Sequence, residues 1–171
     1  MPIDATRLRS LVERELEQLS DARVLANIRR LLVAPRPILR DWNYGKPGEQ
    51  YPCWEILNDD PSNSGTGIVY CESGFGPERP WGLVWLSGDN LSMGDDSGWF
   101  STFLDAYFDC FAPTVLPIWR VVKHNSSGNP IPLTDEGDWD ERWEQVATFK
   151  KADPNSSFYV HHTIPYGSKT A

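Results

Sequence analysis

The residues best suited to covalent chemistry in this sequence are its cysteines and histidines. Cys53, Cys71 and Cys110 each stand among apolar residues, while His161 and His162 are adjacent in an apolar run. A thiolate nucleophile needs a neighbouring base. Successive residues of a strand point to opposite faces, so at most one of these two histidines can reach Cys71. Because cysteines in apolar surroundings are usually inert, we predict no catalytic residue.

Metal and phosphate sites have no convincing pattern either. Asp89, Asp95 and Asp96 stand in one glycine-containing segment, but the glutamate that closes a calcium loop is missing. Gly74 and Gly76 are not followed by the Gly-Lys-Ser of a phosphate-binding loop. Turn and helix-cap chemistry accounts for all of these residues, and we therefore expect no metal and no cofactor.

The net charge of −8 is concentrated in the middle of the chain. Residues 41–112 hold twelve acidic residues against two basic ones, whereas residues 1–40 carry a net charge of +3. A sustained acidic field opposes binding to nucleic-acid phosphates. The same field speeds the encounter with a basic protein. We therefore expect a basic protein partner and no nucleic acid.

Candidate binding residues follow from that acidic segment. Tryptophan is enriched among the residues that dominate protein interfaces, so one tryptophan joins the acids in our candidate set: Asp59, Asp60, Glu72, Glu78, Trp81, Asp89, Asp95 and Asp96. Further aromatic residues stand beside turn or acidic residues, and some of them can be exposed anchors: Trp42, Tyr44, Trp139 and Trp143.

The cysteine count and the N-terminus indicate the compartment. Three is an odd number of cysteines, and the first twenty residues are charged and periodic instead of uniformly apolar. We expect a cytoplasmic protein with no membrane partner and with three free thiols.

The first 37 residues are predicted to be helical. Leu8, Leu16, Val24 and Leu31 belong to two apolar stripes at helical spacing, formed by either one long bent helix or two. The prolines at 35 and 37 end this segment. Residues 38–51 read as a connector rich in turn-forming residues, and Cys53–Leu57 as a short strand.

The central segment, residues 67–111, organises the rest of the chain. Two apolar strands, Ile68–Cys71 and Trp81–Leu86, flank the glycine- and proline-rich loop Gly74–Pro80, which predicts an antiparallel hairpin. A helix is expected over Trp99–Phe111, capped by residues 95–97, with Trp99 and Phe103 on its buried face.

The remaining elements complete an α+β pattern. We expect strands over Val115–His124 and Phe158–Ile164, with a helix between them that begins at Asp135 or Asp138. Consecutive strands without intervening helices argue against a doubly wound α/β fold. The sequence thus predicts a single α+β domain over residues 1–171, with a helical segment 1–37 and a core 38–171. In that core, helices pack on a mainly antiparallel sheet.

Three stretches carry a resemblance: YCESGFGP at 70–77, PWGLV at 80–84 and MGDDSGWF at 93–100. They resemble a block found in small uncharacterised bacterial proteins. The layout of N-terminal helices, antiparallel strands, acidic charge and many aromatics is similar to that of bacterial toxin-immunity proteins, including the SUKH superfamily. This resemblance implies a protein that neutralises a cognate toxin by covering it with an acidic aromatic surface. Two alternatives stay open: a small hydrolase-like enzyme with Cys71 or a carboxylate near the hairpin, and a structural or phage-derived accessory protein.

Overall fold

The computed structural model describes residues 3–59 and 65–167. The chain divides into two compact units, which are described separately: unit 1 (Met1–Pro113 and Tyr166–Ala171) and unit 2 (Thr114–Pro165). Each contains helices and an antiparallel sheet, so the predicted α+β fold is confirmed. That the whole chain forms a single domain stays a prediction.

Two helices, and not one bent helix, begin unit 1. Asp4 caps α1 (Ala5–Leu16) by accepting a hydrogen bond from the Arg7 amide, and Asp21 caps α2 (Ala22–Leu31) in the same way. Each cap satisfies an amide that has no partner inside its helix. The predicted apolar stripes are the buried faces of both helices.

The prediction was wrong for residues 32–41 and 50–51, whereas residues 42–49 form turns and bends as predicted. The helical segment ends at Leu31, and β1 (Leu32–Asp41) follows at once and pairs antiparallel with β2 (Gln50–Asn58). Prolines at 35 and 37 suggested a helix stop and a connector. Yet β1 is an edge strand, where a residue without an amide donor is tolerated.

The five-stranded sheet of unit 1 has the order β1-β2-β3-β4-β5, and all its pairs are antiparallel. β3 (Thr66–Tyr70) and β4 (Trp81–Trp85) form the predicted hairpin, with Val69 opposite Gly82. The hairpin prediction is thus confirmed. Its connecting loop is closed by a hydrogen bond from the Cys71 amide to the Pro80 carbonyl, 2.8 Å.

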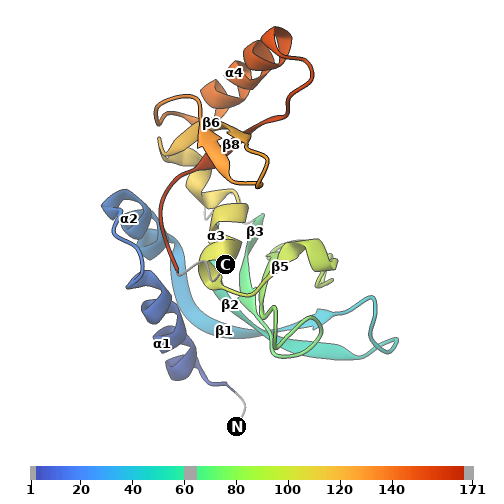
Figure 1. Cartoon of the computed structure of the whole chain (residues 1–171). Helices are drawn as coiled ribbons and strands as arrows, with labels where there is room; N and C mark the ends of the chain where they lie inside the picture. The colour runs from blue at the N-terminus through green and yellow to red at the C-terminus, as the bar shows by residue number, and fades with distance from the viewer. Residues whose placement is uncertain (1–2, 60–64, 168–171) are drawn as a thin grey trace. The chain divides into compact units, whose positions relative to one another are not determined.

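The two faces of this sheet are covered differently. On one face, Trp81 meets Tyr70 and the Phe103 ring of α3 (Phe103–Asp109) edge-on, at centroid distances of 4.9 and 5.3 Å. Figure 1 shows α1, α2 and α3 gathered beside this sheet. The other face carries a second buried cluster, formed by Cys53, Val69, Cys71, Val84, Met93 and Trp99. Partly buried aromatic side chains cover that second cluster.

The helix predicted over Trp99–Phe111 is shorter than expected. Trp99 lies in β5 (Trp99–Phe100), opposite Gly82 of β4, and Asp95 caps only the 3-10 turn η1 (Asp96–Gly98). α3 begins four residues later, because Thr102 provides its N-cap by accepting from the Asp105 amide at 3.0 Å. Trp99 and Phe103 are both buried as predicted, but they do not share a helix.

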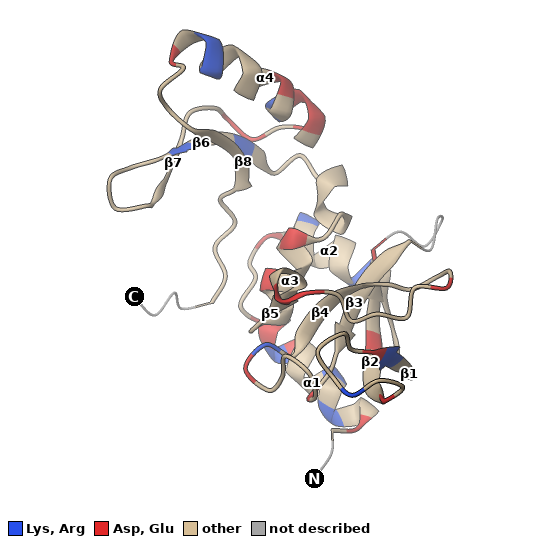
Figure 2. Ribbon diagram, turned by 90° about the vertical axis from the view of Figure 1, so that its right-hand side faces the viewer, with Lys and Arg blue, Asp and Glu red and all other residues tan. Residues whose placement is uncertain are grey.

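Unit 2 consists of a three-stranded antiparallel sheet and one helix. The strand order is β7-β6-β8, formed by β6 (Trp119–His124), β7 (Pro130–Pro132) and β8 (Phe158–His162). β6 begins four residues after the predicted start of its strand at Val115, which is the last residue of η2 (Ala112–Val115), and β7 was not predicted. α4 (Trp139–Ala152) packs on β6 and β8 and is capped by Asp138. Its first turn is acidic and its last turn basic, as Figure 2 shows, which complements the helix dipole.

The chain returns to unit 1 after β8. The Tyr166 hydroxyl donates to an oxygen of Asp105 at 2.9 Å, and its ring stacks on Phe108 at a centroid distance of 4.9 Å. Both partners belong to α3, so residues far apart in the sequence complete the same helix surface.

Candidate binding site

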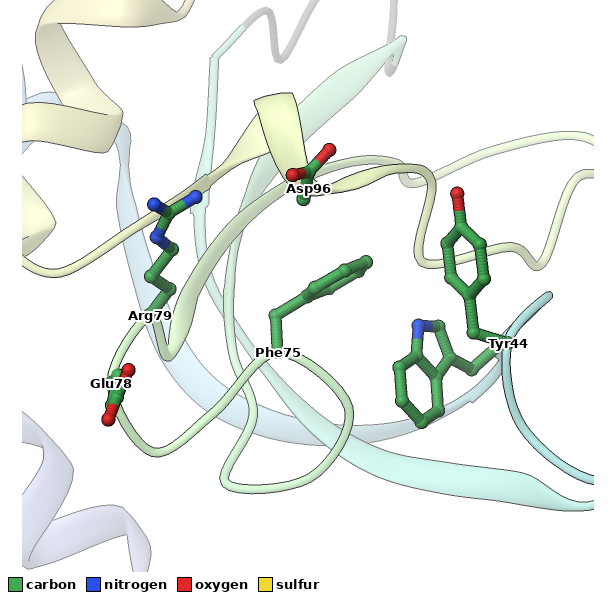
Figure 3. Close-up of a pocket in the computed structure, with 6 residues that line it drawn as sticks. Tyr44, Phe75, Glu78, Arg79 and Asp96 are labelled. Atoms are coloured by element: carbon green, nitrogen blue, oxygen red, sulfur yellow. The ribbon is translucent and has the colours of Figure 1, made fainter.

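An open pocket of about 500 Å³ lies on unit 1. Three aromatic and three charged residues line it: Trp42, Tyr44, Phe75, Glu78, Arg79 and Asp96. Figure 3 shows the Phe75 ring between Arg79 and Tyr44, with Asp96 toward the top of the view and Glu78 at the lower left beside Arg79.

Three segments bring these residues together. Trp42 and Tyr44 follow the end of β1, Phe75 to Arg79 belong to the β3–β4 loop, and Asp96 opens η1. The backbone of Asp41 ties two of these segments: its amide donates to the Leu91 carbonyl at 2.9 Å, and its carbonyl accepts from the Met93 amide at 2.8 Å. The Gly76 amide folds the loop back on itself by donating to the Ser73 carbonyl.

The aromatic wall is a contiguous cluster. The Phe75 ring lies 5.6 Å from Trp42 and 6.1 Å from Tyr44, and both contacts are edge-to-face. Tyr51 supports the far side of Trp42 at 5.7 Å. Such edge-to-face pairs match the positive ring edges to the negative ring faces. Trp42 and Phe75 pack on the buried cluster of the sheet, whereas Tyr44 is 68% exposed.

Two glycines make room for the buried side chains of Trp99 and Met93, on which these aromatic residues pack. A Cβ on Gly82 would lie 2.5 Å from the ring of Trp99, so only glycine admits the indole above β4. The Trp99 Nε1 then donates to the Met93 carbonyl at 2.7 Å. Gly74 has a φ of +67°, which favours glycine, and its Cα faces the Met93 methyl. Gly74, Gly82 and Trp99 therefore have structural roles.

The charged side chains of the pocket have no partner in the described residues. Glu78, Arg79 and Asp96 are exposed, and their charged groups form neither ion pairs nor hydrogen bonds within the described ranges. The neighbouring Asp95 differs, because Ser97 donates to it from both hydroxyl and amide. These bonds lower the pKa of Asp95. Two carboxylates and one guanidinium of the pocket are thus available to a ligand.

The two central cysteines lie in the buried cluster below the pocket. Cys53 on β2 and Cys71, directly after β3, are both buried, and their thiols donate to the backbone carbonyls of Tyr51 at 3.8 Å and Pro52 at 3.4 Å. The neighbouring Cys71 thiol and burial raise the pKa of Cys53. All three histidines of the sequence belong to unit 2, so residues 1–113 contain no imidazole base for Cys71. Among residues 3–59 and 65–167, no three His, Cys, Asp or Glu side chains are grouped to hold a metal ion.

The structure brings together only part of the predicted binding set. Glu78 and Asp96 line the pocket, and Asp95 adjoins it. Glu72 and Asp89 are exposed but do not line it; Glu72 instead accepts from the Ile3 amide at 3.4 Å. Asp60 lies outside the described residues.

Two members of that set, Trp81 and Asp59, are interior residues, which corrects their place among the candidate binding residues. Trp81 is 3% exposed, because α3 covers its face of β4. Asp59 is 8% exposed and accepts from the Thr66 hydroxyl at 2.6 Å across the β2–β3 connection. Acidity and residue type alone did not reveal these contacts.

Phe75 and Arg79 were missed as site residues. The sequence did contain a signal for Phe75, because a large apolar residue between Gly74 and Gly76 does not help to form a turn. Trp42 and Tyr44 are among the aromatic residues that the sequence offers as candidate anchors, and both line the pocket.

No family model, no curated protein and no solved structure matches the chain. None of the helices in the described part of the chain is long and apolar enough to cross a membrane.

Proposed function

We propose that this chain is a cytoplasmic binding protein of the immunity type, which neutralises a basic toxin domain by covering its functional surface with the pocket face of unit 1. Nucleic acids and membranes are not partners in this proposal. The protein acts by occlusion and catalyses no reaction.

One observation carries the proposal: the pocket combines aromatic side chains with carboxylates that have no partner in the described residues. Aromatic residues dominate the energetics of protein interfaces. The carboxylates belong to a segment with twelve acids and two bases, which steers a basic partner toward this face. The burial of Cys71 and the lack of an imidazole in residues 1–113 give the hydrolase alternative no comparable support.

The test is affinity capture from a bacterial lysate that contains candidate partners, with two matched baits. The site variant carries Tyr44→Ala and Asp96→Lys. The control variant carries Tyr159→Ala and Glu144→Lys, which alter an exposed tyrosine and an exposed acid of unit 2. A cognate partner should bind the wild type and the control but not the site variant.

The captured protein must also be toxic. Expressed alone it should arrest growth, and co-expression of the wild-type chain, but not of the site variant, should restore growth. A partner that binds all three baits equally, or that is harmless when expressed alone, would contradict the proposal.

A further inference from the structure

The pocket has two kinds of wall, and both suit a cation. We infer that it receives the guanidinium group of an arginine side chain from the basic partner, an inference that rests on the proposed function. Arginine is favoured over lysine because its planar group stacks on aromatic rings and pairs with carboxylates in a fixed geometry.

Three aromatic rings of the pocket are in mutual contact and can attract a cation. Trp42, Tyr44 and Phe75 lie within 5.6–6.1 Å of one another, centroid to centroid. A cation within about 6 Å of a ring centroid is attracted to the ring face. Tyr44 is the most exposed of the three, so a ligand can reach its ring without displacing the chain.

The two carboxylates of the pocket, which have no partner in the described residues, also favour a cation. Asp96 of η1 and Glu78 of the β3–β4 loop both line the pocket, on two different segments. Figure 3 shows them on different sides of the Phe75 ring, with the Asp96 carboxylate turned away from that ring. A carboxylate ligand would face both of these charges, and an apolar ligand would leave them without a counter-ion. A guanidinium group can pair with a carboxylate and stack on a ring at the same time.

Arg79 distinguishes a cationic ligand from an anionic one, because it is the one cation among the pocket's lining residues. If the ligand is a guanidinium, Arg79 repels it, and Arg79→Gln should tighten binding about two- to five-fold. If the ligand is instead an anion, Arg79 is its main contact and the same substitution should weaken binding.

The experiment titrates the full chain with blocked glycine pentapeptides that carry arginine, citrulline, lysine or glutamate at the centre. Citrulline has the shape of arginine without its charge. The readout is the NMR signal of the Trp42 indole N–H, which has no acceptor in the described residues and is assigned by its loss in Trp42→Phe. Asp96→Asn tests the carboxylate, and Glu144→Gln, an exposed acid of unit 2, is its matched control.

We expect the arginine peptide to shift the signal and citrulline to leave it unchanged. Asp96→Asn should weaken arginine binding about two- to five-fold, and Glu144→Gln should not change it. Equal shifts by arginine and citrulline, preference for glutamate, weaker binding in Arg79→Gln, or no shift with any peptide would each overturn the inference.

Failure of this inference is distinguishable from failure of the proposed function. If only the inference fails, the Tyr44 and Asp96 variant still loses its captured toxin while no arginine peptide binds. If only the proposed function fails, the arginine peptide binds while no captured protein depends on this face.

Discussion

Phe103 and Tyr44 are both aromatic residues of unit 1, but their surroundings give them different roles. Phe103 is completely buried, and its ring meets Trp81 edge-on. Tyr44 stands at the pocket with most of its ring exposed. Substitution of the first should therefore affect stability, and substitution of the second should affect binding.

Phe103→Ala should lower the free energy of unfolding by about 3–5 kcal/mol, because it removes a buried ring and leaves a cavity beside Trp81. Chemical denaturation measures this loss. Phe111→Ala is the control, since Phe111 is 72% exposed, and it should cost less than about 1 kcal/mol. Similar losses in the two variants would contradict the arrangement of α3.

Gly82→Ala should destabilise unit 1 by about 1–3 kcal/mol, because the added methyl group overlaps the Trp99 ring. Gly98→Ala is the matched control: its Cβ would lie 3.7 Å from the nearest atom, the Leu83 carbonyl oxygen, and the change should stay below about 1 kcal/mol. Denaturation curves and the fluorescence of Trp99 would report both. An unaffected Gly82→Ala protein would place Trp99 elsewhere.

The three thiols should be unreactive in the folded protein. Cys53, Cys71 and Cys110 are buried, and burial raises the pKa of Cys110 to about 12. The Cys110 thiolate, which is the reactive form, is therefore scarce at neutral pH. Cys53 lowers the pKa of Cys71, so the protection of the Cys71 thiol comes from its complete burial. An aromatic disulfide reagent should modify none of them in buffer and all three in denaturant without reductant. Rapid reaction of the native protein would reopen the hydrolase alternative.

At the scale of elements, α1 and α3 are joined by one carboxylate. Both oxygens of Glu15 in α1 accept hydrogen bonds from α3, from the amides of Phe103 and Leu104, each at 3.0 Å. These amides belong to the first turn of α3, whose donors have no partner inside the helix. A residue 88 positions away in the sequence thus helps to define where α3 begins.

Glu15→Ala should cost about 1–2 kcal/mol of unfolding free energy, the usual range for loss of a helix cap. Glu15→Gln adds a pH test. Burial raises the pKa of Glu15 above 4.5, so the folded state binds its proton more tightly than the unfolded state. The stability that this proton provides is present below pH 4.5 and is lost as the pH rises through the folded pKa.

The stability of the wild type relative to Glu15→Gln should therefore decrease as the pH rises from about 4 to 7. Paired denaturation curves across this range measure the difference. A difference that increases with pH would mean that the hydrogen bonds to α3 outweigh the burial of the carboxylate.

Sequence patterns predicted the elements whose signals are local. The apolar stripes around Leu8 and Val24 and the hairpin of β3 and β4 were predicted correctly, because their periodicity or turn chemistry lies within a short window. β1 and the start of α3 were not, because pairing with β2 and with Gly82 overrides the local signals of proline and aspartate. The pocket likewise depends on three distant segments, so the sequence indicated its acids and two of its aromatic residues, Trp42 and Tyr44, but not Phe75 and Arg79.

At the scale of the whole molecule, the acidic segment should control the rate of association with a partner. Replacing Glu78, Asp89 and Asp96 together by lysine should slow association with the captured partner, and the effect should shrink as the salt concentration rises. Because all three are exposed, the unfolding transition should hardly change. Stopped-flow measurements across a salt series provide the test.

The matched control replaces Asp140, Glu141 and Glu144 by lysine, which changes the net charge equally but on α4 of unit 2. Its effect on the association rate should be smaller. Equal slowing by both triple variants would mean that net charge, and not the pocket face, steers the partner.

The return of Tyr166 to α3 has a consequence for synthesis on the ribosome. Phe108 is made 58 residues before the tyrosine that stacks on it. At about 5–20 residues per second, the nascent α3 waits roughly 3–12 s for this partner. During that interval unit 2 is completed while one apolar side of α3 stays uncovered. The contact of Tyr166 with α3 in unit 1 thus forms only after unit 2 has been made. A chaperone that binds exposed aromatic surface would find its target in this interval.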